Sequence, residues 1–176
     1  WGLSSNKLFF SDALPVKNAS LAGYATAFDR TTNYFNMPVG TEQAIVGLRN
    51  AGLIAFGSDK IYTVNPSAVP AATDFVDKVL DVGCVEGKTV CEVGDDVFFL
   101  AKDGVRGIMK SAADKSTGQS LPLSYPLKTE VEAISWAYIS KACAVYYDNK
   151  YFISLPTVNS TYNNQVWVYY PAMNSW

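Results

Sequence analysis

Histidine is absent from the 176-residue sequence. This absence excludes Ser-His-Asp and Cys-His catalysis, metal binding through imidazole and a histidine pH switch. Arginine is scarce, and Lys plus Arg (14) nearly balances Asp plus Glu (16), which gives a net charge of −2. A protein that grips nucleic acid through its phosphates needs a basic stripe, and the sequence has none. The charged fraction is 17% and the apolar fraction 49%, which together indicate a globular chain.

Long apolar runs and a cysteine framework are missing as well. The longest apolar runs, such as Ala142 to Tyr147, are far shorter than the ~18 residues of a membrane span, so no membrane-spanning segment is expected. Three cysteines are too few and too scattered for a disulfide scaffold, which favours a reducing cytosol or a particle assembled there. The sequence starts at Trp1 without a signal-like segment, so we expect a processed chain or a piece of a longer one.

What the sequence does contain is a repeated motif: an apolar strand, a tight turn and a second strand. Its three clearest copies span residues 53–64, 97–108 and 144–154. The flanks are rich in aromatic and β-branched residues, which suit a pleated sheet, and the turns carry residues that tolerate tight backbone geometry. Each copy therefore predicts a β-hairpin.

The turn aspartates give the period of this repeat. Asp59, Asp103 and Asp148 lie 44 and 45 residues apart, and a degenerate copy places Asp12 another 47 residues before Asp59. A propeller blade of four antiparallel strands needs about 40–50 residues. The sequence therefore predicts an all-β fold, a β-propeller-like array of antiparallel four-stranded blades with about four repeats of 44–47 residues. We expect it to form a single domain over residues 1–176, either complete or part of a larger propeller.

Five other stretches carry structural expectations. Residues 45–48 and 166–170 read as further strands. Helix-like spacing at 73–80 and 129–138 indicates either short helices or connections between blades, and residues 111–120 read as an exposed loop.

Cys84 and Cys91 flank a candidate two-residue hairpin about Gly87-Lys88. In that register the two cysteines face each other as a hydrogen-bonded pair, the wider of the two pair types, which does not favour a disulfide. Buried free thiols are the favoured alternative.

Two pairs of carboxylates are candidate chemical sites. Asp95 and Asp96 are adjacent and could supply a general acid and base, but Gly94-Asp95-Asp96 has the composition of a solvated turn, which is favoured. Glu130 and Glu132 would share one face of an extended segment and could hold a cation, yet the alternating oxygen ligands and pivot glycine of a calcium loop are missing. We therefore predict no catalytic, cofactor-binding or metal-binding residues, and a protein that is not an enzyme.

Aromatic residues, 14% of the chain, gather in its last third. The group comprises Tyr146, Tyr147, Tyr151, Phe152, Tyr169 and Tyr170, with Trp167 and Trp176 nearby. Such side chains can stack on sugars or bases, but in a blade they alternate inward and pack between sheets, which is the favoured interpretation.

Three strings resemble blade motifs of one family: residues 6–12, 94–105 and 164–176. They are similar to the β-propeller tail hub, nozzle or DNA-stabilisation proteins of short-tailed bacteriophages, and kelch-like propellers share the Val-Trp-Val-Tyr followed by Trp. The phage resemblance implies a structural virion protein, assembled in the host cytoplasm into a homo-oligomeric ring at the end of the portal. It implies tail and portal proteins as partners, with transient, non-specific passage of DNA during genome ejection. Members of the family are usually several times longer than this chain.

A binding propeller that recognises a cell-surface glycan or protein through exposed aromatics is the alternative function. No cofactor is expected under either interpretation.

Overall fold

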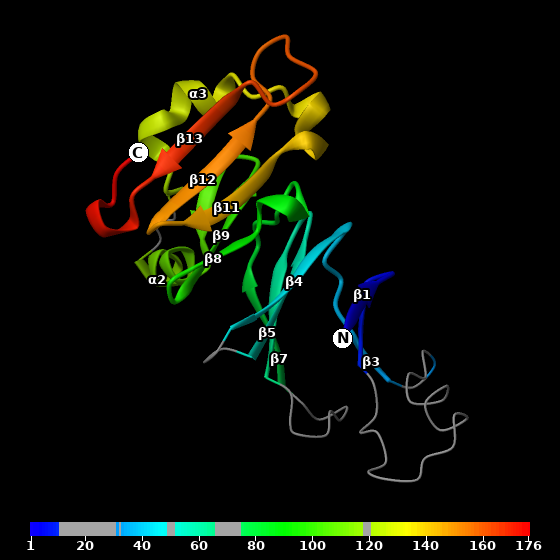
Figure 1. Cartoon of the computed structure of the whole chain (residues 1–176). Helices are drawn as coiled ribbons and strands as arrows, with labels where there is room; N and C mark the ends of the chain where they lie inside the picture. The colour runs from blue at the N-terminus through cyan, green and yellow to red at the C-terminus, as the bar shows by residue number, and fades with distance from the viewer. Residues whose placement is uncertain (11–30, 32, 49–51, 66–74, 118–120) are drawn as a thin grey trace, which may run out of the picture. The chain divides into compact units, whose positions relative to one another are not determined.

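The computed structural model describes residues 1–10, 31, 33–48, 52–65, 75–117 and 121–176 (Figure 1). The chain divides into two compact units, Trp1–Val82 and Gly83–Trp176, and each unit is described by itself. Asp12 lies outside the described residues. No helix in the described ranges is long and apolar enough to cross a membrane.

The first unit contains two antiparallel sheets. One sheet has the order β1 (Gly2–Ser4), β2 (Lys7–Phe9), β3 (Tyr34–Asn36), and the other β4 (Glu42–Leu48), β5 (Gly52–Gly57), β6 (Ile61–Asn65), β7 (Phe75–Leu80). The turn between β1 and β2 is Ser5-Asn6, and both residues have positive φ, 54° and 58°, a geometry that matches the twist of a hairpin. Buried residues from both sheets share one apolar cluster, which includes Leu8, Phe35, Ala55 and Val64.

The second unit also contains two antiparallel sheets, each of three strands. The first sheet has the order β8 (Cys91–Val93), β9 (Asp96–Ala101), β10 (Gly104–Gly107), and the second β11 (Cys143–Tyr147), β12 (Lys150–Leu155), β13 (Gln165–Tyr169). The helices are α2 (Ile108–Thr117) and α3 (Lys128–Glu132), with short 3-10 helices at Gly87–Thr89, Tyr125–Leu127, Trp136–Lys141 and Pro171–Met173.

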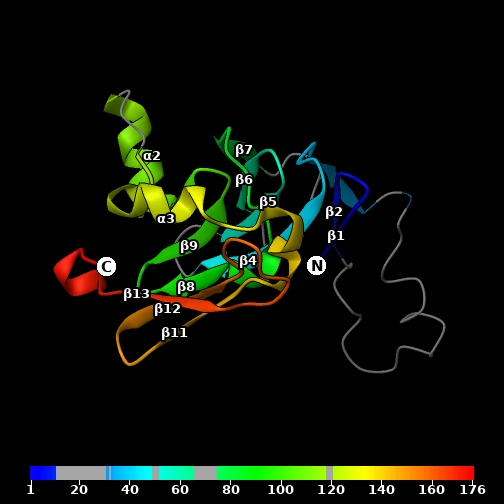
Figure 2. The ribbon, with the colours of Figure 1, turned by 90° about the horizontal axis from the view of Figure 1, so that it is seen from above.

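These two sheets of the second unit pack face to face. Phe98 and Leu100 of β9 share one buried cluster with Tyr151 and Ile153 of β12, and the Phe98 ring meets the Tyr151 ring edge-on at 5.4 Å between centroids. Figure 2 shows β11–β13 as a layer beneath β8 and β9, with α2 on the opposite side. Strand β12 alternates between partly exposed and buried residues, so only its Tyr151, Ile153 and Leu155 face points into this core.

The mostly β character and the antiparallel sheets of three or four consecutive strands confirm the coarse prediction. The hairpins at 53–64, 97–108 and 144–154 are confirmed as β5–β6, β9–β10 and β11–β12, and the strands at 45–48 and 166–170 as parts of β4 and β13. The arrangement as propeller blades and the single domain stay predictions.

The equivalence of the three turn aspartates is wrong. Asp59 and Asp103 follow the second strand of their sheets, but Asp148 follows the first strand of its sheet. Their partners differ too: the Asp103 carboxylate binds the buried Arg106, and Asp148 pairs with Lys150. Every hairpin needs a residue that tolerates a tight turn. An aspartate therefore indicates that a turn is present, but not which two strands of the sheet the turn connects.

Three local predictions also need correction. The proposed hairpin about Gly87-Lys88 is a 3-10 helix, residues 73–80 contain strand β7 rather than a helix, and residues 111–117 of the expected loop belong to α2. Pairing with β6 decides the conformation of β7, because helix-like spacing in so short a segment is a weak preference. The predicted helix within 129–138 is confirmed by α3.

Candidate interaction surface

Asp95 and Asp96 have separate structural roles. Asp95 is exposed in the Gly94-Asp95 turn that joins β8 to β9, as the solvated-turn interpretation predicted. Asp96 begins β9, and its Oδ1 accepts hydrogen bonds from the backbone N–H groups of Val97 (2.7 Å) and Met109 (2.8 Å). Because Met109 lies at the start of α2, the Asp96 carboxylate caps that helix from a strand.

The surroundings of Asp96 fit this structural role. Burial raises the pKa of its carboxyl, an effect partly opposed by backbone hydrogen bonds, of which the one from Met109 is the strongest. A Cβ on Gly107 would lie 2.5 Å from the second carboxylate oxygen, so the absence of a side chain there makes room for Asp96. A surface hollow of about 420 Å³ adjoins the group, lined in part by Phe98 and Tyr169.

Replacing Asp96 by Asn is expected to remove part of the pH dependence of stability. Because the folded-state pKa is raised, the folded protein binds more protons than the unfolded chain between the two pKa values, so this group makes stability fall as pH rises from about 4 through the raised pKa. The free energy of unfolding, measured with urea from pH 3.5 to 7, should therefore contain a smaller pH-dependent loss in D96N than in the wild type. D95N, which leaves the hydrogen bonds of Asp96 intact, should keep the wild-type decline, and equal profiles for all three proteins would contradict the assignment.

Glu130 and Glu132 do not share one face. Both lie on helix α3, where residues two apart point in different directions, so the shared face that an extended segment would provide is not formed. Glu132 is instead within 3.9 Å of the Lys128 ammonium, an exposed pair one helical turn apart. Among the residues that the structure describes, no group of three or more His, Cys, Asp or Glu could hold a metal ion.

All three cysteines are free thiols. Cys84 is buried, its Sγ donates to the Glu86 carbonyl at 3.2 Å, and burial raises its pKa to about 11. Cys91 is half-buried on β8, and burial also raises its pKa. The buried-thiol alternative is thus confirmed for Cys84, and its high pKa makes it a poor nucleophile. Cys143 is exposed on β11.

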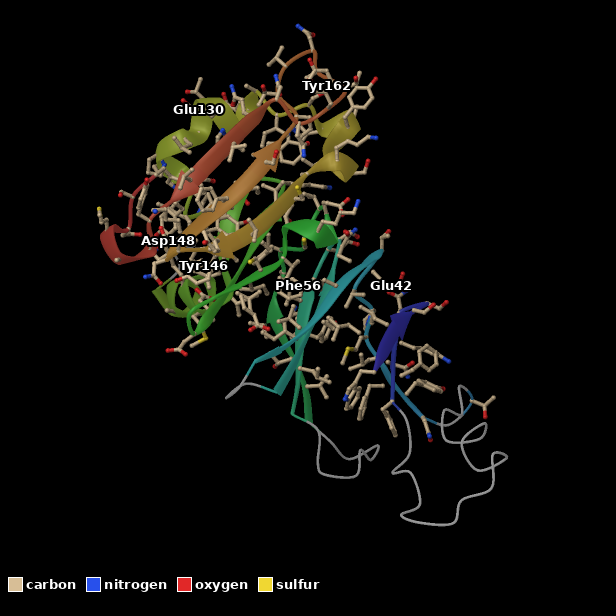
Figure 3. All side chains as sticks on the ribbon, in the orientation of Figure 1. Glu42, Phe56, Glu130, Tyr146, Asp148 and Tyr162 are labelled. Carbon is tan, nitrogen blue, oxygen red and sulfur yellow. The ribbon has the colours of Figure 1, made fainter. Side chains whose placement is uncertain are left out.

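The aromatic residues of the last third lie on two faces of the β11–β13 sheet. Tyr151, Trp167 and Tyr169 are buried in the core, as the packing interpretation predicted, and Trp176 packs against them with its indole N–H donating to the Leu123 carbonyl at 2.9 Å. Tyr147 instead is 73% exposed. In Figure 3 the labelled Asp148 marks the turn of the β11–β12 hairpin, and Tyr162 stands in the loop between β12 and β13.

The side of the sheet opposite the core, here called the outer face, is mostly apolar. Direct cross-strand pairing groups its side chains in rows, with Val145, Phe152 and Val168 in the central row. The complete set is Cys143, Val145, Tyr147, Lys150, Phe152, Ser154, Val166 and Val168. Val145 is 55% and Val166 59% exposed, so large hydrophobic side chains face outward from a regular sheet, which is unusual unless something covers them.

The β8–β10 sheet of the same unit shows how the equivalent positions pack there. The β8–β9 and β11–β12 hairpins both have two-residue turns, so the pair Val145–Phe152 corresponds to Cys91–Phe98. One row further from the turn, Ser154–Val166 corresponds to Leu100–Val105. In the β8–β10 sheet these positions pack into the core between the two sheets. The outer face therefore carries apolar residues at positions that are covered in the sheet before it.

Sequence reasoning missed this face, although one indication was present. Residues 142–147 contain no charged or amide side chain, and a strand without polar–apolar alternation is typical of one buried on both sides. The role of Asp96 had no such indication, because its partner helix begins 12 residues later in the chain.

No protein-family model matches the chain, and no curated protein is significantly similar to it in sequence. What the protein does must therefore be inferred from its residues and their arrangement, above all from the outer face.

Proposed function

We propose that the chain is a structural, non-catalytic subunit whose antiparallel sheets stack as propeller-type blades in a bacteriophage tail of the hub or nozzle kind. The observation that carries this proposal is the outer face, whose apolar residues occupy positions that the preceding sheet uses for packing against its neighbour. A sheet with both faces apolar is a building block of a longer stack. Oligomeric assembly within the tail would supply the missing cover.

The order of the strands supports the blade interpretation. In each of the four sheets the strands are neighbours in the order in which they follow one another along the chain. Propellers are built from such antiparallel sheets, one after another. The near-balance of charge, with a net charge of −2, suits a conduit that lets DNA pass without holding its phosphates.

The proposal is tested on particles of a tailed phage that encodes this chain. Mass spectrometry of gradient-purified particles should detect the chain at a fixed ratio to the portal protein, and an early, non-structural phage protein provides the negative control. Recovery of the chain only from the soluble fraction of the lysate, with none in the particles, would refute a virion role.

A binding propeller is the second candidate, and exposed tyrosines favour it. Tyr147 and Tyr162 are 73% and 68% exposed and can stack on a sugar ring. Strong glycan-array binding that Tyr162→Ala abolishes, together with absence from particles, would support this candidate over the structural one.

A further inference from the structure

We propose that the outer face is the contact through which two copies of this chain form a twofold dimer, with one outer face against the other. The inference rests on the proposed structural role, because it names the partner of the same face. Three properties of the described residues carry it: the charge of the face, the scarcity of any other apolar strand surface, and the central position of Phe152.

The face is close to neutral, so two copies do not repel each other. Its one charged side chain is Lys150, whose Nζ lies 2.7 Å from the Asp148 carboxylate at the adjoining turn. Cys143, Val145 and Phe152 add no charge. In a twofold contact each surface meets a copy of itself, so unpaired charges of one sign would repel. An apolar surface whose one cation is already paired with a carboxylate of the same chain avoids that repulsion.

In the described ranges, no other strand of the chain has large exposed hydrophobic side chains that could cover the outer face of a second copy. Among the side chains that the structure describes, the large exposed hydrophobic residues on strands are Val145, Tyr147 and Val166. The remaining ones lie in helices, loops or at Trp1. The apolar sheet surface that can cover the outer face of one copy is therefore the outer face of another, which gives an isologous contact.

Phe152 is placed at the centre of this contact. It lies on the middle strand, directly between Val145 of β11 and Val168 of β13. Two sheets packed face to face lie about 10 Å apart with interlocking side chains. In such a dimer Phe152 would be enclosed by the valines of both copies, as the central residues of interfaces are, and Tyr147 would lie toward the turn end of the face.

The test is sedimentation of the full chain over a range of concentrations, under reducing conditions because Cys143 is exposed. The wild type should show a reversible monomer–dimer equilibrium. Val145→Lys should weaken the dimer about 100-fold or more, because the twofold axis brings two unpaired ammonium groups into one apolar contact. The matched control is Val158→Lys, a valine 61% exposed in the loop after β12, which should dimerise like the wild type.

A second measurement, made on the wild type, does not depend on whether a variant folds. Cys143 lies on the outer face, so its alkylation by iodoacetamide should slow as wild-type concentration rises, and should not slow in Val145→Lys. A wild type that stays monomeric at all concentrations, or a Val145→Lys dimer as tight as the wild type, would overturn the dimer. A chain that dimerises through this face but is absent from purified particles would overturn the structural role alone, whereas presence in particles without the dimer would overturn this inference alone.

Discussion

Tyr151→Ala is expected to lower the free energy of unfolding by about 3–5 kcal/mol, because it removes a large side chain from a closely packed core. Tyr151 is completely buried between the two sheets of the second unit. Its ring meets Phe98 edge-on, and its hydroxyl donates to the Thr89 carbonyl at 3.2 Å. The substitution thus opens a cavity and leaves the Thr89 carbonyl without this partner. Urea denaturation followed by circular dichroism measures the effect.

Two further variants separate the contributions. Tyr151→Phe keeps the ring and removes the hydroxyl, so it should cost about 1–2 kcal/mol. Tyr162→Ala makes the same truncation at a loop tyrosine that is 68% exposed, and should change stability by less than about 0.5 kcal/mol. If Tyr151→Ala were no more destabilising than Tyr162→Ala, the packing of β9 against β12 described above would be wrong.

The hairpins were predictable from the sequence because their determinants are local. Asp148 and Asn149 both adopt positive φ, 48° and 56°, a conformation that these residue types tolerate better than most. The aromatic and β-branched flanks then specify strands on both sides. Strand pairing between chain neighbours follows from a two-residue turn, so all three predicted hairpins are found.

The order of the strands within their sheets was not predictable in this way. A 45-residue spacing aligned Asp148 with Asp103, but topology aligns the Asp148 turn with Gly94-Asp95. The cause lies between β10 and β11, where the described residues, 108–117 and 121–142, contain α2 and α3 and no named strand. Helix α2 starts where the Asp96 carboxylate accepts the Met109 N–H, a contact made only after β9 and α2 come together.

For a chemical site the sequence offered only exclusions. The missing histidines and the isolated carboxylates indicated a protein without a catalytic centre, and this stays a prediction. The outer face could not be located, because an apolar strand such as β11 has the same sequence pattern whether one sheet or two cover it. Whether this face is exposed depends on whether another sheet packs against it, and the sequence of one strand does not specify that.

Gly104→Ala is expected to lower the free energy of unfolding by about 3–5 kcal/mol, through backbone strain and a steric clash together. Gly104 begins β10 with a φ of +128°, which side-chain-bearing residues rarely adopt. A Cβ there would lie 2.1 Å from the Ser124 hydroxyl oxygen. Ser124 is fully buried, and that oxygen accepts the Val105 N–H at 2.9 Å, so its displacement would break the link between β10 and the segment that carries Leu123.

Gly94→Ala is the matched control, since it isolates the backbone contribution within the same sheet. Gly94 also has positive φ, +62°, but a Cβ there would meet nothing within 4 Å. Its substitution should therefore lower the free energy of unfolding by only about 1–2 kcal/mol, because alanine is less stable than glycine in the left-handed conformation. Urea denaturation of both variants gives the difference, which measures the clash with Ser124 together with the greater backbone strain at the φ of Gly104. Equal losses for the two variants would show that Ser124 moves aside without consequence, and that its hydrogen bond to Val105 does not hold β10 in place.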